Sequence, residues 1–380
     1  MIHARPDRAQ SDSKKWQKYA GQDILPMWIA DADFAVDPAI VAALGARLEH
    51  DVFGYGGETE ALKNAIVAHC ARQYGWAIER EWIVFLPGVV PGLNFSRAVS
   101  VLRGKAAGVV SMPTYPHLFN HPALFPFTHH GVDCLLQGER FVPDFAGLDA
   151  AVDADTGLLL LCHPHNPVGR VHTDEELHAY HALAKKHDLI VCSDEIHCDL
   201  ILNGTRHRPF ASLDADALVR TITLMAPSKT WNIAGLCCAF AIIANEDLRR
   251  DFNRVTLGMN DVNVLGTHAA LAALEHGETW REALIGTLRE NAEYTHARIN
   301  AMPPLRMTPV EGTYLAWIDA RELPVDNAQR FFEAHGVGLN DGADYGAPGF
   351  VRLNMACDKS LLQEALARME RAIATLGAKK

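Results

Sequence analysis

Three short apolar runs set the strongest constraint on how this chain can fold. They cover residues 158–162, 189–193 and 221–224, and a polar residue follows closely after each run. Runs of this length, rich in Leu, Ile and Val, predict strands that are buried in a parallel sheet. Between the first two runs, Thr173-Asp-Glu-Glu176 reads as a capping box and begins a helical pattern. The spacing of roughly 30 residues suits a strand, a helix and a second strand, so the chain is predicted to be an α/β protein.

The polar residues after these runs are an amide, an acid and an amine, namely Asn166, Asp194 and Lys229. Parallel strands bring the residues that follow them to one edge of the sheet, where open α/β sheets bind ligands. These groups are the equipment needed to hold pyridoxal phosphate: Lys229 for the aldehyde, Asp194 for the pyridine nitrogen and Asn166 for the ring hydroxyl. The small apolar residues 233–236 suit a buried lysine, whose pKa falls on desolvation so that its amine can act as a nucleophile.

Each of these residues also has an ordinary explanation. Lys229 could be a surface lysine after a strand, Asp194 could cap the next helix, and Asn166 could form a turn with Pro167. The presence of all three in this order favours the cofactor hypothesis.

Longer motifs around these residues resemble a known family. Asn166-Pro-Val-Gly169, Asp194-Glu-Ile-His197 and residues 228–235 are similar to the signature of fold-type I pyridoxal-phosphate enzymes of the aminotransferase class I/II superfamily. The similarity is closer to the carbon–sulfur β-lyases of the MalY/PatB branch. The motifs that carry this closer resemblance span nearly the whole chain and lie at residues 27–34, 53–56, 87–90, 312–317 and 350–354.

The resemblance implies a fold with two parts. Residues 45–275 would form a large domain that binds pyridoxal phosphate on a mostly parallel, seven-stranded sheet. Residues 1–44 and 276–380 would form a smaller α+β domain, whose N-terminal arm crosses toward the active site. The last helix of this domain is predicted to begin with a capping box at Ser360.

A glycine-rich turn is the candidate phosphate site. The predicted strand 82–86 runs into Gly88, Val89 and Val90, and a helical pattern follows. Backbone N–H groups at the start of a helix favour an anion, although the turn could also be a plain connection between strand and helix. Ser228, beside the lysine, is the candidate for a further phosphate donor.

Three further residues receive roles from the resemblance. Tyr115 follows a predicted strand and would stack on the pyridine ring, although a buried aromatic is more often part of the core. Tyr55 would reach the cofactor phosphate of a second subunit, which implies a homodimer with shared active sites; alternatively it lies in a flexible glycine-rich turn. Arg352 would clamp the α-carboxylate of an amino-acid substrate, although an arginine in a strand is often a half-exposed partner of an acid.

The type of reaction is inferred from two differences between this chain and the aminotransferase pattern. Aminotransferase relatives have a tyrosine three residues after the aspartate and an arginine eight residues after the lysine, whereas this chain has His197 and Cys237. We therefore expect a β-lyase that converts L-cystathionine or related cysteine S-conjugates to a thiol, pyruvate and ammonia. His197 would take the place of the tyrosine near the cofactor. An aminotransferase, and a binding or regulatory protein on the same scaffold, remain as alternatives.

Composition and charge limit which binding partners and which cellular location can be expected for this chain. The net charge of −11 gives no basic face for nucleic acid, and no window approaches the roughly 20 apolar residues of a membrane span. The start of the chain lacks the apolar core of a signal peptide, so a cytoplasmic enzyme is expected. Eight cysteines without a Cys-x-x-Cys pair predict reduced thiols. Nineteen histidines show no trusted ligand spacing, so no metal site is predicted.

Overall fold

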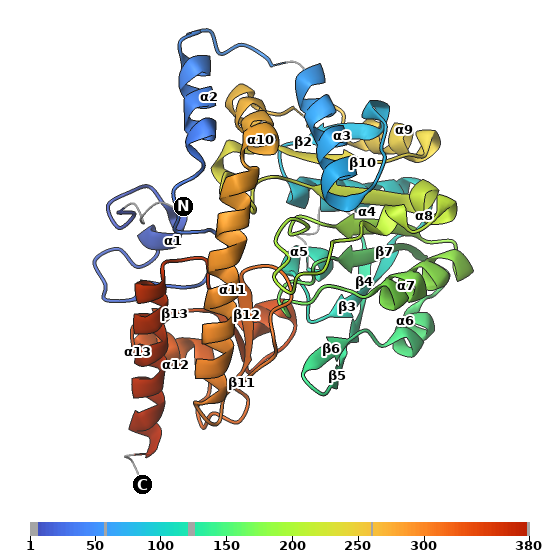
Figure 1. The fold of residues 1–380 in the computed structure, drawn as a ribbon. Helices are drawn as coiled ribbons and strands as arrows, with labels where there is room; N and C mark the ends of the chain where they lie inside the picture. The colour runs from blue at the N-terminus through green and yellow to red at the C-terminus, as the bar shows by residue number, and fades with distance from the viewer. Residues whose placement is uncertain (1–6, 57–58, 121–125, 260, 378–380) are drawn as a thin grey trace.

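The main sheet has seven strands in the order β2-β10-β9-β8-β7-β3-β4 (Figure 1). The computed structural model describes residues 7–56, 59–120, 126–259 and 261–377. Neighbouring strands are parallel except that β10 runs antiparallel to both of its neighbours. The predicted mostly parallel, seven-stranded sheet is thus confirmed. Its strands are β2 (Ile83–Leu86), β3 (Ala107–Met112), β4 (Thr128–Asp133), β7 (Thr156–Cys162), β8 (Ile190–Asp194), β9 (Thr221–Met225) and β10 (Ala239–Ile242).

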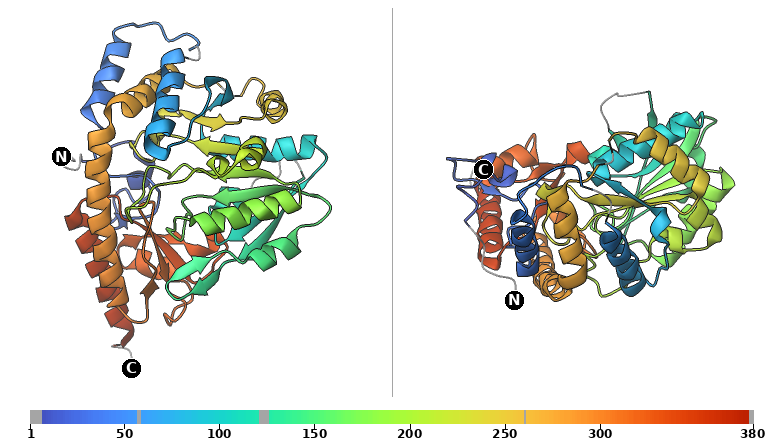
Figure 2. Two further views of the ribbon diagram at one scale, coloured as in Figure 1. Left: turned by 45° about the vertical axis from the view of Figure 1, so that its right-hand side comes forward. Right: turned by 90° about the horizontal axis from the view of Figure 1, so that it is seen from above.

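Helices cover both faces of this sheet (Figures 1 and 2). Leu158 and Leu160 of β7 pack in the same buried cluster as α4 and α9, whereas Leu159 and Leu161 pack with α6 and α7. Successive side chains of a strand point to opposite faces, so a strand covered on both sides has to be apolar throughout. The covering helices are α4 (Val89–Leu102), α5 (Pro116–Phe119), α6 (Phe145–Ala151), α7 (Asp174–Lys186), α8 (Ala215–Arg220) and α9 (Glu246–Val255).

A second, antiparallel sheet has four strands in the order β11-β12-β15-β14. The long helix α11 connects the two sheets in the chain, and α13 packs beside it (Figure 1). The bounds are β11 (Arg306–Met307), β12 (Leu315–Asp319), β14 (Asn340–Asp341), β15 (Phe350–Asn354), α11 (Glu278–Asn300), α12 (Ala328–Ala334) and α13 (Lys359–Gly377).

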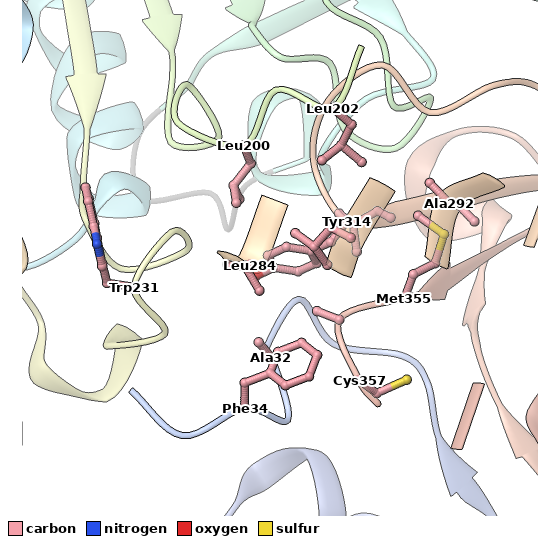
Figure 3. Close-up of a cluster of buried hydrophobic side chains, with 14 of the residues drawn as sticks. Ala32, Phe34, Leu200, Leu202, Trp231, Leu284, Ala292, Tyr314, Met355 and Cys357 are labelled. Carbon is pink, nitrogen blue, oxygen red and sulfur yellow. The ribbon is translucent and has the colours of Figure 1, made fainter. Parts of the chain in front are cut away.

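The N-terminal segment packs with the C-terminal part of the chain. β1 (Leu25–Pro26) pairs in parallel with β13 (Val337–Gly338). Figure 3 shows Ala32 and Phe34 in one buried cluster with Tyr314 of the C-terminal part. The remaining elements are α1 (Lys14–Gln17), α2 (Pro38–Leu48), α3 (Glu60–Tyr74), α10 (Val264–His276) and the hairpin of β5 (Leu135–Gln137) with β6 (Arg140–Val142).

The two predicted capping boxes have different outcomes. Thr173 and Glu176 make both reciprocal bonds of a capping box at the start of α7, so that prediction is confirmed. The prediction for the last helix is wrong. The carboxylate of Asp358 accepts hydrogen bonds from the N–H groups of Ser360 and Leu361 at 3.0 and 3.1 Å. A carboxylate is as good a cap as a hydroxyl, and this one lies just before the first helical turn.

Two further structural findings concern disulfide bonds and membrane-spanning helices. None of the eight cysteines, all of which lie in the described ranges, forms a disulfide bond. Among the described residues, no helix combines the length and the apolar character that a membrane span needs.

Candidate active site

The three polar residues singled out in the sequence meet at the carboxyl edge of the central strands. Asp194 is the last residue of β8, in register with Cys162 of β7 and Leu224 of β9. Asn166 lies in the turn after β7, and Lys229 lies in the turn after β9. Because these three strands are parallel and adjacent, the turns that follow them converge on one side of Asp194.

The amine of Lys229 is held in a half-buried position. It donates a hydrogen bond of 2.8 Å to the carbonyl oxygen of Ala30. Burial lowers the pKa of Lys229 to about 8, and the nearby carboxylates of Asp31 and Asp194 oppose that change. An appreciable share of the amine is therefore unprotonated near neutral pH, as a nucleophile or a general base requires.

Asp194 is a buried acid whose environment disfavours its charge. Its side chain accepts a hydrogen bond of 3.2 Å from the N–H of Ile196, and it forms no ion pair among the described residues. Burial raises the pKa of Asp194 to about 7, and the neighbouring Glu195 adds to the rise. A cationic group placed beside this carboxyl would stabilise the charged form.

Arg352 is a buried cation with neutral partners only. Its Nη1 donates to Oδ1 of Asn166 at 2.9 Å, and its Nη2 donates to the carbonyl oxygen of Trp28 at 3.0 Å and to Oδ1 of Asn340 at 2.7 Å. The guanidinium lies 4.7 Å from the ring centre of Tyr345. Within the described part of the chain, Nε has no hydrogen-bond partner and no carboxylate pairs with the guanidinium. A buried cation of this kind favours the binding of an anion.

Two aromatic side chains and one imidazole surround these groups. Burial raises the pKa of Tyr115, with a further contribution from Asp194, which places the tyrosine near that carboxyl. Burial lowers the pKa of His197 to about 3, so its imidazole is neutral, and the ring meets Tyr314 edge to face at 5.9 Å. Nδ1 of His197 has no partner within the described residues.

The predicted phosphate residues lie at the start of α4. Gly88 is the residue before the helix, and Val89 and Val90 begin it. Both β2 and β9 run antiparallel to β10, so α4 starts at the same edge of the sheet at which Lys229 lies. Ser228 is half-buried next to Lys229.

Two other residues named from the sequence are exposed in the single chain. Tyr55 is fully exposed and lines a surface hollow of about 490 Å³ formed by residues 53–56 and 261–265. Cys237 is also exposed, and its thiol lies near the carbonyl oxygens of Ala234 and Gly235 in its own turn.

Sequence reasoning did not assign roles to the segment that crosses the site. Residues 27–34 contribute to the resemblance as a motif, yet in the structure the carbonyl oxygens of Trp28 and Ala30 accept hydrogen bonds from Arg352 and Lys229. A backbone carbonyl has no sequence signature, because every residue has one. The position of Tyr314 beside His197 is also hard to predict from the sequence. Its neighbour Thr313 adopts a left-handed φ of 73°, which a sequence does not reveal.

A metal centre is not evident in the described part of the chain. Among those residues, no group of three or more His, Cys, Asp or Glu is arranged to hold an ion.

Comparisons with known proteins find relatives that match nearly the whole chain. Cystathionine beta-lyase PatB of Bacillus subtilis is 35% identical to the chain, over 97% of the chain and 98% of that protein. A crystal structure of OvoB superposes with a TM-score of 0.94 at 45% identity, covering 98% of this chain and 99% of that one. Cystalysin from Treponema denticola, in a crystal structure that contains pyridoxal 5'-phosphate, superposes with a TM-score of 0.93 at 30% identity, covering 99% of both chains.

One protein family matches most of the length of the chain. Residues 28–369 match the family described as aminotransferase class I and II. The range includes both sheets and every candidate site residue named above. The resemblance predicted from the motifs is thus confirmed, and the chain belongs to the aminotransferase class I and II family.

Proposed function

We propose that the protein is a pyridoxal-phosphate-dependent carbon–sulfur β-lyase. It would convert L-cystathionine or a related cysteine S-conjugate to a thiol, pyruvate and ammonia. The observation that carries this proposal is the half-buried amine of Lys229, whose pKa is lowered to about 8, near the buried acid Asp194 and the buried cation Arg352, neither of which forms an ion pair among the described residues. The relatives named above support it, because PatB is named a cystathionine beta-lyase and the cystalysin structure contains the cofactor.

The residues at the sheet edge fit this cofactor. Lys229 offers an amine for its aldehyde, and Asp194 offers a carboxylate for its protonated ring nitrogen. Asn166 can donate from Nδ2 to the ring hydroxyl, because Arg352 occupies its Oδ1. Tyr115 offers a flat face for the ring, and neutral His197 has Nδ1 without a partner among the described residues.

The phosphate would be held at the start of α4. The backbone N–H groups in the first turn of an α-helix have no partner within the helix and favour an anion. Those of Gly88, Val89 and Val90 would bind the phosphate oxygens, and the hydroxyl of Ser228 would add one donor from the turn that holds Lys229.

When bound, pyridoxal phosphate supplies an aldehyde that reacts with amines and a ring that takes up the negative charge developing at Cα. Arg352 binds the α-carboxylate of the substrate through its guanidinium. Lys229 removes the proton from Cα with its neutral amine, which its lowered pKa makes available. Asp194, ionised beside a cation, keeps the proton on the ring nitrogen in place.

Elimination rather than amino transfer is the outcome that we favour. The chain has His197 and Cys237 where aminotransferase relatives carry tyrosine and arginine. Neither residue excludes amino transfer, so an aminotransferase is the second candidate. A binding or regulatory protein is a weaker candidate, because Lys229, Asp194 and Arg352 are all in place at the sheet edge.

A product assay tests this proposal. The protein loaded with pyridoxal phosphate is incubated with L-cystathionine alone, and in parallel with L-alanine and 2-oxoglutarate. We expect pyruvate from L-cystathionine without a keto-acid acceptor, at a rate well above amino transfer from alanine. The reverse ranking would identify an aminotransferase and would leave the cofactor assignment intact.

Replacing Arg352 with lysine tests the carboxylate clamp. Lysine keeps a charge but loses the planar pair of donors, so kcat/KM is expected to fall by roughly ten- to a thousandfold, at about 1.4 kcal/mol per tenfold. The loss should be similar for L-cystathionine and for S-methylcysteine, since both carry the α-carboxylate. Steady-state kinetics on the two substrates measures it. A loss confined to one substrate would show that Arg352 contacts the leaving half instead.

We also propose a homodimer with shared active sites. Large apolar side chains are exposed in the two segments that form the hollow or closely precede them in the chain: Phe53 at 57%, in the lining, and Leu257 at 84% and Met259 at 55%, just before residues 261–265. Exposed apolar groups that gather on one face are typical of a subunit interface. A second copy on this face would bring Tyr55 to the phosphate site of its partner.

Mixed dimers test the shared site. Lys229→Ala and Tyr55→Phe subunits should each be inactive or strongly impaired, and mixing them should restore part of the activity. In the hybrid, one site has an intact lysine together with the intact tyrosine of the other chain. The measurement is lyase activity after subunit exchange, with exchange shown by differently tagged chains. Proven exchange without recovery would remove Tyr55 from the site.

The division into domains and the location are proposals as well. A large cofactor domain at 45–275 and a small domain from 1–44 and 276–380 are supported by the pairing of β1 with β13. A cytoplasmic location is supported by the eight free thiols, which persist in a reducing compartment.

A further inference from the structure

The crossing segment, residues 27–34, is held by an unusually complete set of hydrogen bonds. Each of the six successive carbonyl oxygens from Met27 to Ala32 accepts a hydrogen bond from a residue outside the segment. The donors are Asn354, Arg352, Lys229, Lys15, Arg8 and Asn232. Figure 3 shows Ala32 and Phe34, from the far end of this segment, packed near Met355 and Cys357. The segment is therefore a fixed part of the site wall.

Two of the donors are asparagines that closely follow the proposed cofactor and substrate residues. Asn354 lies two positions after Arg352, on the same strand β15. Its Nδ2 donates to the carbonyl oxygens of Ile29 at 2.6 Å and Asp31 at 2.9 Å, and its Oδ1 accepts from the N–H of Ala356 at 2.8 Å. The side-chain amide of Asn354 is thus fully used, inside a completely buried site.

Asn232 makes the equivalent connection on the side of the lysine. It lies three positions after Lys229 and adopts a left-handed φ of 58°, which asparagine tolerates better than most residues. Its Oδ1 accepts from the N–H of Ala32 at 3.2 Å, and its Nδ2 donates to the carbonyl oxygens of Ala32 at 3.0 Å and Phe34 at 2.9 Å.

The same segment also accepts a hydrogen bond from each of the two functional side chains. Ala30 accepts from Lys229 and Trp28 accepts from Arg352. Lysine and arginine have long, flexible side chains, so ordering them costs conformational entropy that a fixed acceptor helps to offset. The positions of Trp28 and Ala30 depend in turn on Asn354 and Asn232, which bind the carbonyl groups around them.

We propose that Asn232 and Asn354 are positioning residues that fix the crossing segment, whose carbonyl groups at Ala30 and Trp28 set the places of the Lys229 amine and the Arg352 guanidinium. The roles of Lys229 and Arg352 rest on the proposed function. The two asparagines hold different stretches of the segment. The side-chain amide of Asn354 binds Ile29, which lies between Trp28 and Ala30, and Asp31, so its loss should both weaken carboxylate binding at Arg352 and slow the proton transfer by Lys229. Asn232 binds Ala32 and Phe34, beyond Ala30, so its loss should chiefly slow the proton transfer.

The test uses cofactor-loaded Asn354→Ala and Asn232→Gly variants. Glycine also accepts the left-handed backbone of position 232, so this change removes the side chain without adding strain. The first readout is the dissociation constant of L-alanine, which has the carboxylate and amine but no leaving group, followed by the absorption of the bound cofactor. The second readout is backbone hydrogen exchange over residues 27–34.

Asn291→Ala is the matched control. The Nδ2 of buried Asn291 donates to the carbonyl oxygens of Met355 and Cys357, both at 2.9 Å, and it makes no described contact with the crossing segment. Asn291→Ala removes these two hydrogen bonds and Asn354→Ala removes three, so the two variants should lose stability of the same order. The control separates a loss of stability from a loss of positioning.

We expect Asn354→Ala to raise the dissociation constant of L-alanine at least tenfold, to raise KM and to lower kcat. Asn232→Gly should lower kcat more than it raises KM, and both should speed exchange over residues 27–34. Asn291→Ala should leave alanine binding and this exchange as in the wild type. Unchanged alanine binding in Asn354→Ala, or an equal effect of Asn291→Ala, would overturn the proposal.

Two provisions keep the test decisive. Should Asn354→Ala fail to fold, Asn354→Ser can replace it, because serine also lacks the two amide donors but keeps a polar side chain. Asn232→Gly tests the hydrogen-exchange prediction independently. Neither alanine binding nor hydrogen exchange requires elimination. A wild-type protein that makes no pyruvate from L-cystathionine would therefore refute the lyase proposal while this positioning test could still succeed or fail.

Discussion

Lys229→Ala is expected to lose covalent capture of pyridoxal phosphate and lyase activity together. The variant lacks the amine that binds the aldehyde and the base that removes the Cα proton. General base catalysis alone contributes roughly a hundred- to ten-thousandfold, so a fall in kcat of at least about a thousandfold is expected. The measurements are the absorption spectrum after removal of free cofactor and pyruvate formation from L-cystathionine.

Lys186→Ala is a suitable control for that change. Lys186 is an exposed lysine at the end of α7, 2.7 Å from Asp149, and it has no contact with the site. Its replacement should preserve both the spectrum and the activity. An active Lys229→Ala protein that keeps the wild-type absorption band would contradict the assignment of the lysine.

Asp194→Asn is expected to stabilise the cofactor-free protein while weakening cofactor binding. The pKa of Asp194 is raised to about 7 in the fold, chiefly by burial, from 3.8 in the unfolded chain. Below 3.8 both states are protonated, so the charge costs nothing. As pH rises from there to about 7 only the unfolded state ionises, and folding loses roughly 4 kcal/mol that stays lost at higher pH. Asparagine avoids that loss.

Urea unfolding of the cofactor-free protein measures the effect. The gain from Asp194→Asn should be larger at about pH 8 than at about pH 5. The dissociation constant of pyridoxal phosphate should rise about ten- to a hundredfold, because a hydrogen bond to a charged group is lost. An Asp194→Asn protein that is no more stable at pH 8 and binds the cofactor normally would reduce Asp194 to a turn residue that accepts a hydrogen bond from Ile196.

Asp199 provides a control with the opposite sign. It is also buried, but its carboxylate accepts from Tyr74 at 2.7 Å and lies 3.0 Å from Nε2 of His69. These partners hold the pKa of Asp199 at about 2 in spite of its burial. Asp199→Asn should therefore destabilise the protein near neutral pH, where Asp194→Asn stabilises it.

The sequence predicts the parts of this structure that depend on side-chain character. A strand such as β7, covered by helices on both faces, has to be apolar throughout, and residues 158–162 show it. Asn166, Asp194 and Lys229 stand out because each follows such a run. The capping box of α7 is visible because both of its partners are side chains.

Features that depend on the backbone or on distant contacts escape such reasoning. Asp358 and Ser360 could both accept hydrogen bonds from the N–H groups at the start of the last helix. The sequence therefore does not show that Asp358, rather than Ser360, is the cap. The roles of Trp28 and Ala30 lie in their carbonyl groups, which any residue could supply. The neutral partners of Arg352 come from segments more than ten residues away in the chain, so its lack of an acid could not be foreseen.

The count of pyruvate molecules formed per active site tests the central proposal most directly. The loaded protein is freed of excess cofactor and incubated with L-cystathionine in the absence of any keto acid, and pyruvate, thiol and ammonia are counted against sites. A lyase regenerates its cofactor in every cycle, so the account predicts many molecules of pyruvate per site, with thiol and ammonia in equal amounts. No more than one keto acid per site, without thiol or ammonia, would contradict it.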